Sequence, residues 1–84
     1  MSYEAIKAKC SHLHPAALEL GLIQEMAADG MRRIGSDEGV SVEAPIMALT
    51  LLIAGNALQL KCPLPDIAAV VSVIRSQDGA QHFH

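Results

Sequence analysis

The hydrophobic positions of the sequence recur at helical spacing in four segments, which proline and glycine residues separate. Side chains three or four positions apart lie on one side of a helix, so each segment predicts a helix with an apolar stripe. Together they predict an all-α fold, a small bundle of about four helices that forms one domain over residues 1–84. The breaks lie at His14-Pro15, Gly35 to Gly39, Cys62 to Pro65, and Asp78-Gly79.

The first two helices are predicted at residues 2–13 and 15–34. Ser2 can cap the first helix through its hydroxyl oxygen, and Pro15 suits the first position of the second. Gly35 is expected to end the second helix in the left-handed conformation, at the start of an acidic turn to Gly39. The stripe expected to face the core contains Ala16, Leu20, Ile23, Ala27, Met31 and Ile34, widened by Leu22 and Met26.

The third helix, predicted over residues 43–61 with Ser41 as its cap, has no charged residue from Ala44 to Leu60. A helix that is apolar on nearly all sides is buried on several sides or spans a membrane. The uncharged run is short for a bilayer and contains Asn56, so the sequence favours a central hydrophobic third helix in a soluble bundle. Its large residues form two stripes, one of Ile46, Leu49, Ile53 and Leu60 and the other of Met47, Leu51 and Leu58.

The fourth helix is predicted over residues 65–77, with Leu64 as its cap and Asp66 where the helix dipole favours an acid. Its stripe is rich in β-branched residues, which favour strands. Helix is the preferred interpretation, because a lone strand would have no partner elsewhere in the chain. The stripe consists of Ile67, Val70, Val71 and Ile74, and residues 79–84 are expected to form a flexible tail.

Composition and charge narrow the functional classes. Of the 84 residues, 51% are hydrophobic but only 2% aromatic, and a domain of this size can bury only part of that surface. The net charge is −3 and the six lysines and arginines are scattered, so the basic face of a nucleic-acid-binding protein is missing from the pattern. The N-terminus does not resemble a signal peptide, and we expect a reduced, cytoplasmic protein without a membrane segment.

One group of residues resembles a metal site. Thiolate and imidazole are the usual zinc ligands, but the spacing here fits no zinc motif, and half of the group lies in the expected tail. We therefore expect neither a metal nor any other cofactor. The group consists of Cys10, His12 and His14 near the start of the chain and His82 and His84 at its end.

The cysteines and acidic residues do not form an arrangement typical of an active site. Cys10 lies on an apolar stripe, and Cys62 follows the third helix at its negative end, where a thiolate is disfavoured. The acidic residues lie on polar helix faces or in a turn, where they are expected to be solvated. We therefore predict that the protein is not an enzyme. These acids are Glu19, Glu25, Asp29, Asp37 and Glu38.

The abundance of apolar surface predicts a non-catalytic protein-binding or regulatory module that acts as a homodimer through a helical surface. The alternative is a helix-turn-helix transcription regulator, in which the fourth helix would read DNA with Ser72, Arg75, Ser76 and Gln77. Asp66 lies at the end of that helix that would meet phosphates, which counts against the alternative. The residues hypothesised to form the protein interface are Met47, Leu51, Leu58, Leu22 and Met26.

The expected lack of a structural metal is testable. Because metal binding contributes directly to folding where a structural site exists, removal of metal by a chelator should leave the melting temperature of this protein unchanged. Thermal denaturation with and without excess EDTA measures this. A large decrease in melting temperature would show that cysteine and histidine side chains hold a metal.

Overall fold

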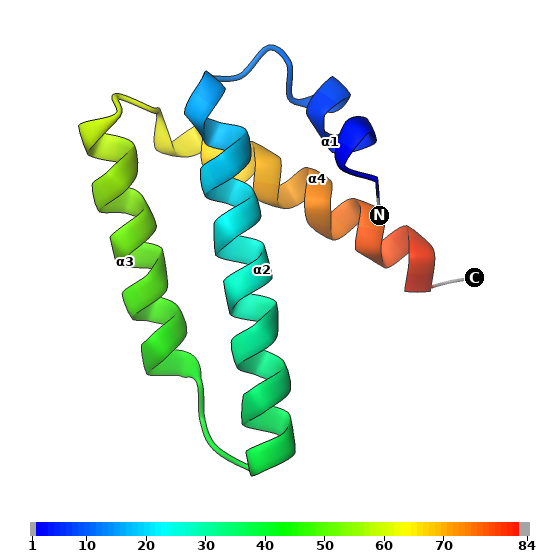
Figure 1. The fold of residues 1–84 in the computed structure, drawn as a ribbon, viewed down its shortest axis with the longest axis vertical. Helices are drawn as coiled ribbons and strands as arrows, with labels where there is room; N and C mark the ends of the chain where they lie inside the picture. The colour runs from blue at the N-terminus through cyan, green and yellow to red at the C-terminus, as the bar shows by residue number, and fades with distance from the viewer. Residues whose placement is uncertain (1, 83–84) are drawn as a thin grey trace.

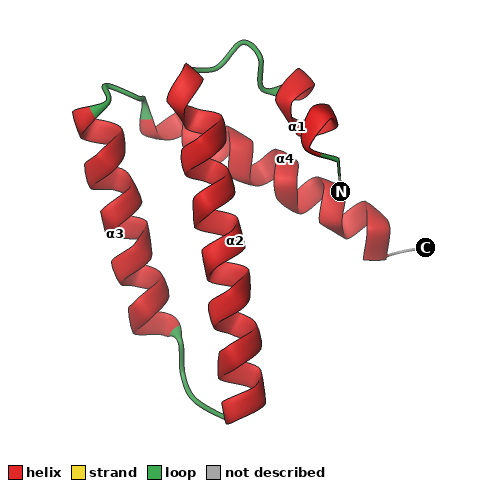
Figure 2. Cartoon of the chain, in the orientation of Figure 1, coloured by secondary structure: helices red, strands yellow, loops and turns green. Residues whose placement is uncertain are grey.

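The computed structural model describes the backbone of residues 2–82 and the side chains of residues 2–77. Within these residues the chain forms α-helices and no strand, and residues 70–74 are helical (Figure 2). The prediction of an all-α small bundle is confirmed. The helices are α1 (Tyr3–Lys9), α2 (Pro15–Glu38), α3 (Glu43–Gln59) and α4 (Leu64–His82).

Helix α2 is the element around which the others are arranged. It runs antiparallel beside α3, α4 crosses it at a steep angle, and α1 packs on α4 (Figure 1). Helix α3 lies at the edge of the molecule, and only Ile53 and Ala57 of its residues are buried. The expectation of a central third helix is therefore wrong: an uncharged helix can be covered on any side, and its sequence does not say how many sides are covered.

The buried side of α2 carries mainly small residues. Gly21 is buried where α2 crosses α4, and a Cβ at this position would lie 2.5 Å from Val70 Cγ1. The expected stripe is largely wrong, because Ile23, Met26 and Ile34 are exposed. Small residues let two helices approach closely, and this contact outweighs the larger apolar residues on the other side. Besides Gly21, the buried apolar side consists of Ala17, Leu20, Ala28 and Gly35.

Helix α2 continues one turn beyond its predicted end. Gly35 is a helical residue, and Gly39 adopts the left-handed conformation (φ 67°) and donates its N–H to the Gly35 carbonyl. The expected turn from Gly35 is therefore wrong. Gly35 is needed for another reason: a Cβ there would lie 2.7 Å from Val42 Cγ1 and 2.9 Å from the Val40 carbonyl oxygen. The loop to α3 packs directly against the backbone at Gly35.

The other helix ends agree with the sequence in part. Ser2 caps α1, since its hydroxyl accepts the Ala5 N–H at 3.4 Å. The expected Ser41 cap is wrong: Val42 precedes α3 without a side-chain hydrogen bond. Helix α4 begins at Leu64 and continues beyond Gln77 into the expected tail, of which residues 83–84 lie outside the described residues.

The core forms where α2, α4 and α1 meet, with a contribution from α3. The predicted α4 stripe is confirmed, because Ile67, Val70, Val71 and Ile74 are all buried. Ile6 of α1 packs in the same cluster, together with Ile53 of α3. Helix α3 contributes only two buried residues, Ile53 and Ala57, so it buries less apolar surface in this core than α2 and α4 do.

The molecule is flat and open for its size. Its Cα atoms extend over 39 × 36 × 15 Å, with a radius of gyration of 13.5 Å. A compact chain of this length would have a radius of gyration of about 12 Å. The accessible surface is 5754 Å², whereas a folded monomer of 8.9 kDa exposes about 4,800 Å². A large part of the apolar surface consequently remains uncovered.

The tight crossing at Gly21 predicts that Gly21→Ala lowers stability. A methyl group would overlap Val70, and overpacking costs about 1–3 kcal/mol, which exceeds the gain of up to about 1 kcal/mol in helix propensity. Thermal unfolding should therefore give a lower melting temperature by several degrees.

Gly30→Ala is the matched control for this experiment, because no atom lies within 4 Å of a Cβ at Gly30 in the same helix. It should raise the melting temperature slightly. Equal effects of the two substitutions would contradict a close contact between α2 and α4 at Gly21.

Candidate protein interface

Helix α3 exposes large apolar side chains on the side that α2 does not cover. Met47, Leu51 and Leu58 are 65%, 69% and 81% exposed. Their spacing of four and seven residues places them on one side of the helix. Ile53 and Ala57, which are buried, lie on a different side and face the core. The structure therefore brings together three of the five residues hypothesised as an interface.

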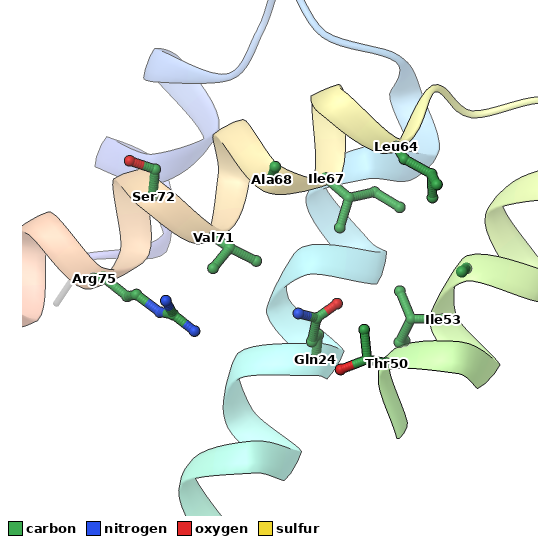
Figure 3. A pocket seen from close by; sticks show the side chains of 10 residues that line it. Gln24, Thr50, Ile53, Leu64, Ile67, Ala68, Val71, Ser72 and Arg75 are labelled. Atoms are coloured by element: carbon green, nitrogen blue, oxygen red, sulfur yellow. The ribbon is translucent and has the colours of Figure 1, made fainter. Parts of the chain in front are cut away.

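A groove lies between α3 and α4, with α2 beneath it (Figure 3). Its volume is about 510 Å³, and it is open to solvent. Ile53 of α3 and Ile67 and Val71 of α4 supply its apolar walls, while Gln24 and Arg75 supply polar groups. The groove exists because α3 and α4 both pack on α2 but diverge from each other.

Two further hollows continue this groove along α3. One, of about 600 Å³, is lined by Met47 and Leu51 and shares Thr50 with the groove. The other, of about 460 Å³, is lined by Leu58 and shares Ala54 with it. The three hollows thus adjoin one strip of α3, and Arg32, Glu43 and Arg75 are also among their lining residues. We call this strip the α3 face and define it as Met47, Thr50, Leu51, Ala54, Gly55 and Leu58.

The other two hypothesised interface residues lie elsewhere. Leu22 is half-buried and packs against the core. Met26 is 69% exposed, but Gln24, two positions earlier, lines the groove. Two residues span about 200° around a helix, so Met26 lies on the opposite side of α2. The α3 face therefore does not include either residue.

Glu25 makes an ion pair that the sequence pattern missed. It was expected on a solvated face, but it is 9% exposed, and its Oε1 accepts a hydrogen bond from Arg75 at 3.0 Å. This pair joins α2 to α4 across the crossing of the two helices. A signal was present in the sequence: Glu25 lies four residues after Gly21 and three before Ala28, on the small-residue side.

Helix α4 offers little to DNA. Asp66 Oδ2 accepts the backbone N–H of His14 at 2.8 Å, which ties the first turn of α4 to the loop before α2. The only cationic residue in the sequence of this helix is Arg75, which binds Glu25. An acid at the helix N-terminus and one engaged arginine give weak support to the helix-turn-helix alternative.

The cysteines are free and buried. Burial raises the pKa of the Cys10 thiol, and burial together with the nearby Asp66 carboxylate raises the pKa of the Cys62 thiol. Both effects disfavour the thiolate, which is the reactive and metal-binding form.

The histidines near Cys10 do not complete a ligand set. His14 Nδ1 accepts the Ala16 N–H at 3.1 Å as the cap of α2, and His12 is exposed. Within the described part of the chain, no three ligand-type side chains gather in a way that could hold a metal. The side chains of His82 and His84 lie outside the described residues.

Membrane insertion and known relatives give no further guidance. Across the described residues, no helix combines the length and the apolar character needed to cross a bilayer. The sequence matches no family model, and no curated protein and no solved structure is similar enough to count as a match. The arguments for function therefore depend on the geometry of the chain itself.

The Glu25–Arg75 pair predicts a stability effect. Arg75→Met should destabilise the fold by about 1–2 kcal/mol, because it leaves a largely buried carboxylate without its charged partner. The effect stays modest since Arg75 itself is 60% exposed and screened by water.

Arg33→Met is the matched control, because Arg33 pairs with Asp29 on the surface, where its side chain is 78% exposed. It should change the free energy of unfolding by about 0.5 kcal/mol or less. Urea denaturation of both variants measures the difference, and equal losses would contradict a structural role for the buried pair.

Proposed function

We propose that this protein is a non-catalytic protein-binding or regulatory module that acts as a homodimer through the α3 face. One observation carries the proposal: α3 has no charge between Ala44 and Leu60, yet only Ile53 and Ala57 of its residues are buried. An uncharged helix with most of its surface in water is typical of a binding surface.

The energetics favour covering the α3 face. Full burial of a Leu or Met side chain contributes about 1.5–3 kcal/mol relative to full exposure. Met47, Leu51 and Leu58 are each at least 65% exposed in the monomer. Burial of each side chain in an interface would therefore contribute most of this free energy to association. In a twofold dimer every residue of the face contributes twice.

The disposition of the polar groups supports a non-catalytic role. Glu25 and Arg75 pair with each other, Asp66 accepts from the backbone, and His14 caps a helix. Both cysteines have a raised thiol pKa. The groups best placed for chemistry are therefore used to hold the helices together, while the α3 face offers only apolar atoms and Thr50.

The homodimer predicts that Leu51→Glu prevents association. A glutamate at the centre of the interface would be buried without a partner, and such a charge is too costly to desolvate. Sedimentation at micromolar concentration should give about twice the 8.9 kDa chain mass for the unaltered protein and the monomer mass for Leu51→Glu.

Met26→Glu is the matched control, because Met26 is as exposed as Leu51, at 69%, but lies across α2 from the groove. It should remain dimeric. A single species of monomer mass for the unaltered protein would overturn the homodimer, and loss of the dimer in Met26→Glu but not Leu51→Glu would overturn the assignment to the α3 face.

A further inference from the structure

We infer that two copies of the chain pair their α3 helices in antiparallel fashion about a twofold axis at Leu51. The inference rests on the proposed function, to which it adds the partner's direction and register. Helix α3 is accessible to a second helix along its length, because it lies at the edge of the molecule and packs mainly on α2 (Figure 1).

The sizes of the exposed residues favour an antiparallel arrangement. With the axis at Leu51, Leu58 of one chain lies level with Ala44 of the other, and Met47 lies level with Gly55. Leu58 and Met47 are then each level with a small residue, and only Leu51, at the axis, is level with its own copy. A parallel pair would instead place large residues level with their own copies and small residues level with theirs, which leaves uneven packing.

The charges at the two ends of α3 favour the same direction. Glu43 begins the helix, and Lys61 follows its end, with no charged residue between them. In the antiparallel pair, Glu43 of one chain lies near Lys61 of the other at both ends of the interface. A parallel pair would bring like charges together, which destabilises a complex.

Gly55 is consistent with this register. In the protomer, no atom lies within 4 Å of a Cβ at Gly55, so the chain leaves space there. The register about Leu51 places Met47 of the partner beside Gly55, where the lack of a side chain would let the second helix approach closely.

Disulfide trapping tests the direction of pairing. Ala44→Cys and Leu58→Cys protein are each oxidised alone and then as an equilibrated mixture, and the covalent dimers are identified by mass. In the antiparallel pair, positions 44 and 44 of the two chains lie about 21 Å apart along the helices. A disulfide requires Cα atoms within about 7 Å, so the mixture should give the mixed dimer and neither variant alone should give a covalent dimer.

The native cysteines do not confuse this test, because both are buried and the pKa of each thiol is raised, so they react slowly. Covalent dimers of either variant alone would overturn the antiparallel pairing. A non-covalent dimer that yields no mixed disulfide would overturn the register at Leu51 while the proposed homodimer survives.

A second pair of variants tests the close approach at Gly55. Gly55→Leu should weaken dimerisation by about tenfold or more, because the added side chain overfills the interface. Gly30→Leu, at a position equally free of neighbours within 4 Å but on α2, should leave the dissociation constant unchanged. Circular dichroism should show both variants folded, since leucine has a higher helix propensity than glycine.

Unchanged dimerisation of Gly55→Leu would overturn the inference. Weakening by Gly30→Leu alone would place the interface on the outer side of α2 and overturn it as well. Absence of any dimer in the unaltered protein would instead reject the proposed homodimer itself, so the two failures are distinguishable.

Discussion

The contact between Gly21 of α2 and Val70 of α4 is the constraint on which the rest of the structure depends. The two helices cross so closely that a Cβ at Gly21 would overlap the valine side chain. Around this point lie the buried stripe of α4 and the ion pair between Glu25 and Arg75. The small side of α2 must therefore face inward, whatever the hydrophobicity of its other side.

That choice of side explains why so much apolar surface remains in water. Once Ala17, Gly21 and Ala28 face the core, Ile23 and Met26 on the opposite side of α2 are exposed. Helix α3 packs beside α2, and α4 crosses α2 at Gly21. Of the first apolar stripe of α3 only Ile53 is buried, and Met47, Leu51 and Leu58 of the second stripe are all exposed.

Self-association through the α3 face accounts for features that the monomer leaves unexplained. These are an uncharged helix at the edge of the molecule and a glycine within that helix where no neighbour needs it. Both features would cost stability or solubility in an isolated chain. A second copy in the antiparallel arrangement gives both a physical purpose.

The sequence by itself determined the elements whose cause is local. Proline and glycine positions separate the four helices, Ser2 caps α1, and the spacing of Ile67, Val70, Val71 and Ile74 identifies the buried side of α4. The uncharged run of α3 also predicted that Met47, Leu51 and Leu58 stay exposed, because a chain of this size cannot bury all of its apolar residues. These features follow from propensity and periodicity within one segment.

Only the tertiary structure decided which sides of α2 and α3 are covered. Hydrophobic periodicity favoured the side of α2 with Ile23 and Met26, but close approach to α4 favoured the side with Gly21, since packing depends on the shapes of two helices together. The same holds for Gly35. Its sequence position suggested a helix end, but glycine is needed there because Val42 of the following loop packs directly against its backbone. Periodicity describes one helix at a time, whereas the position of a side chain in the fold depends on its neighbours.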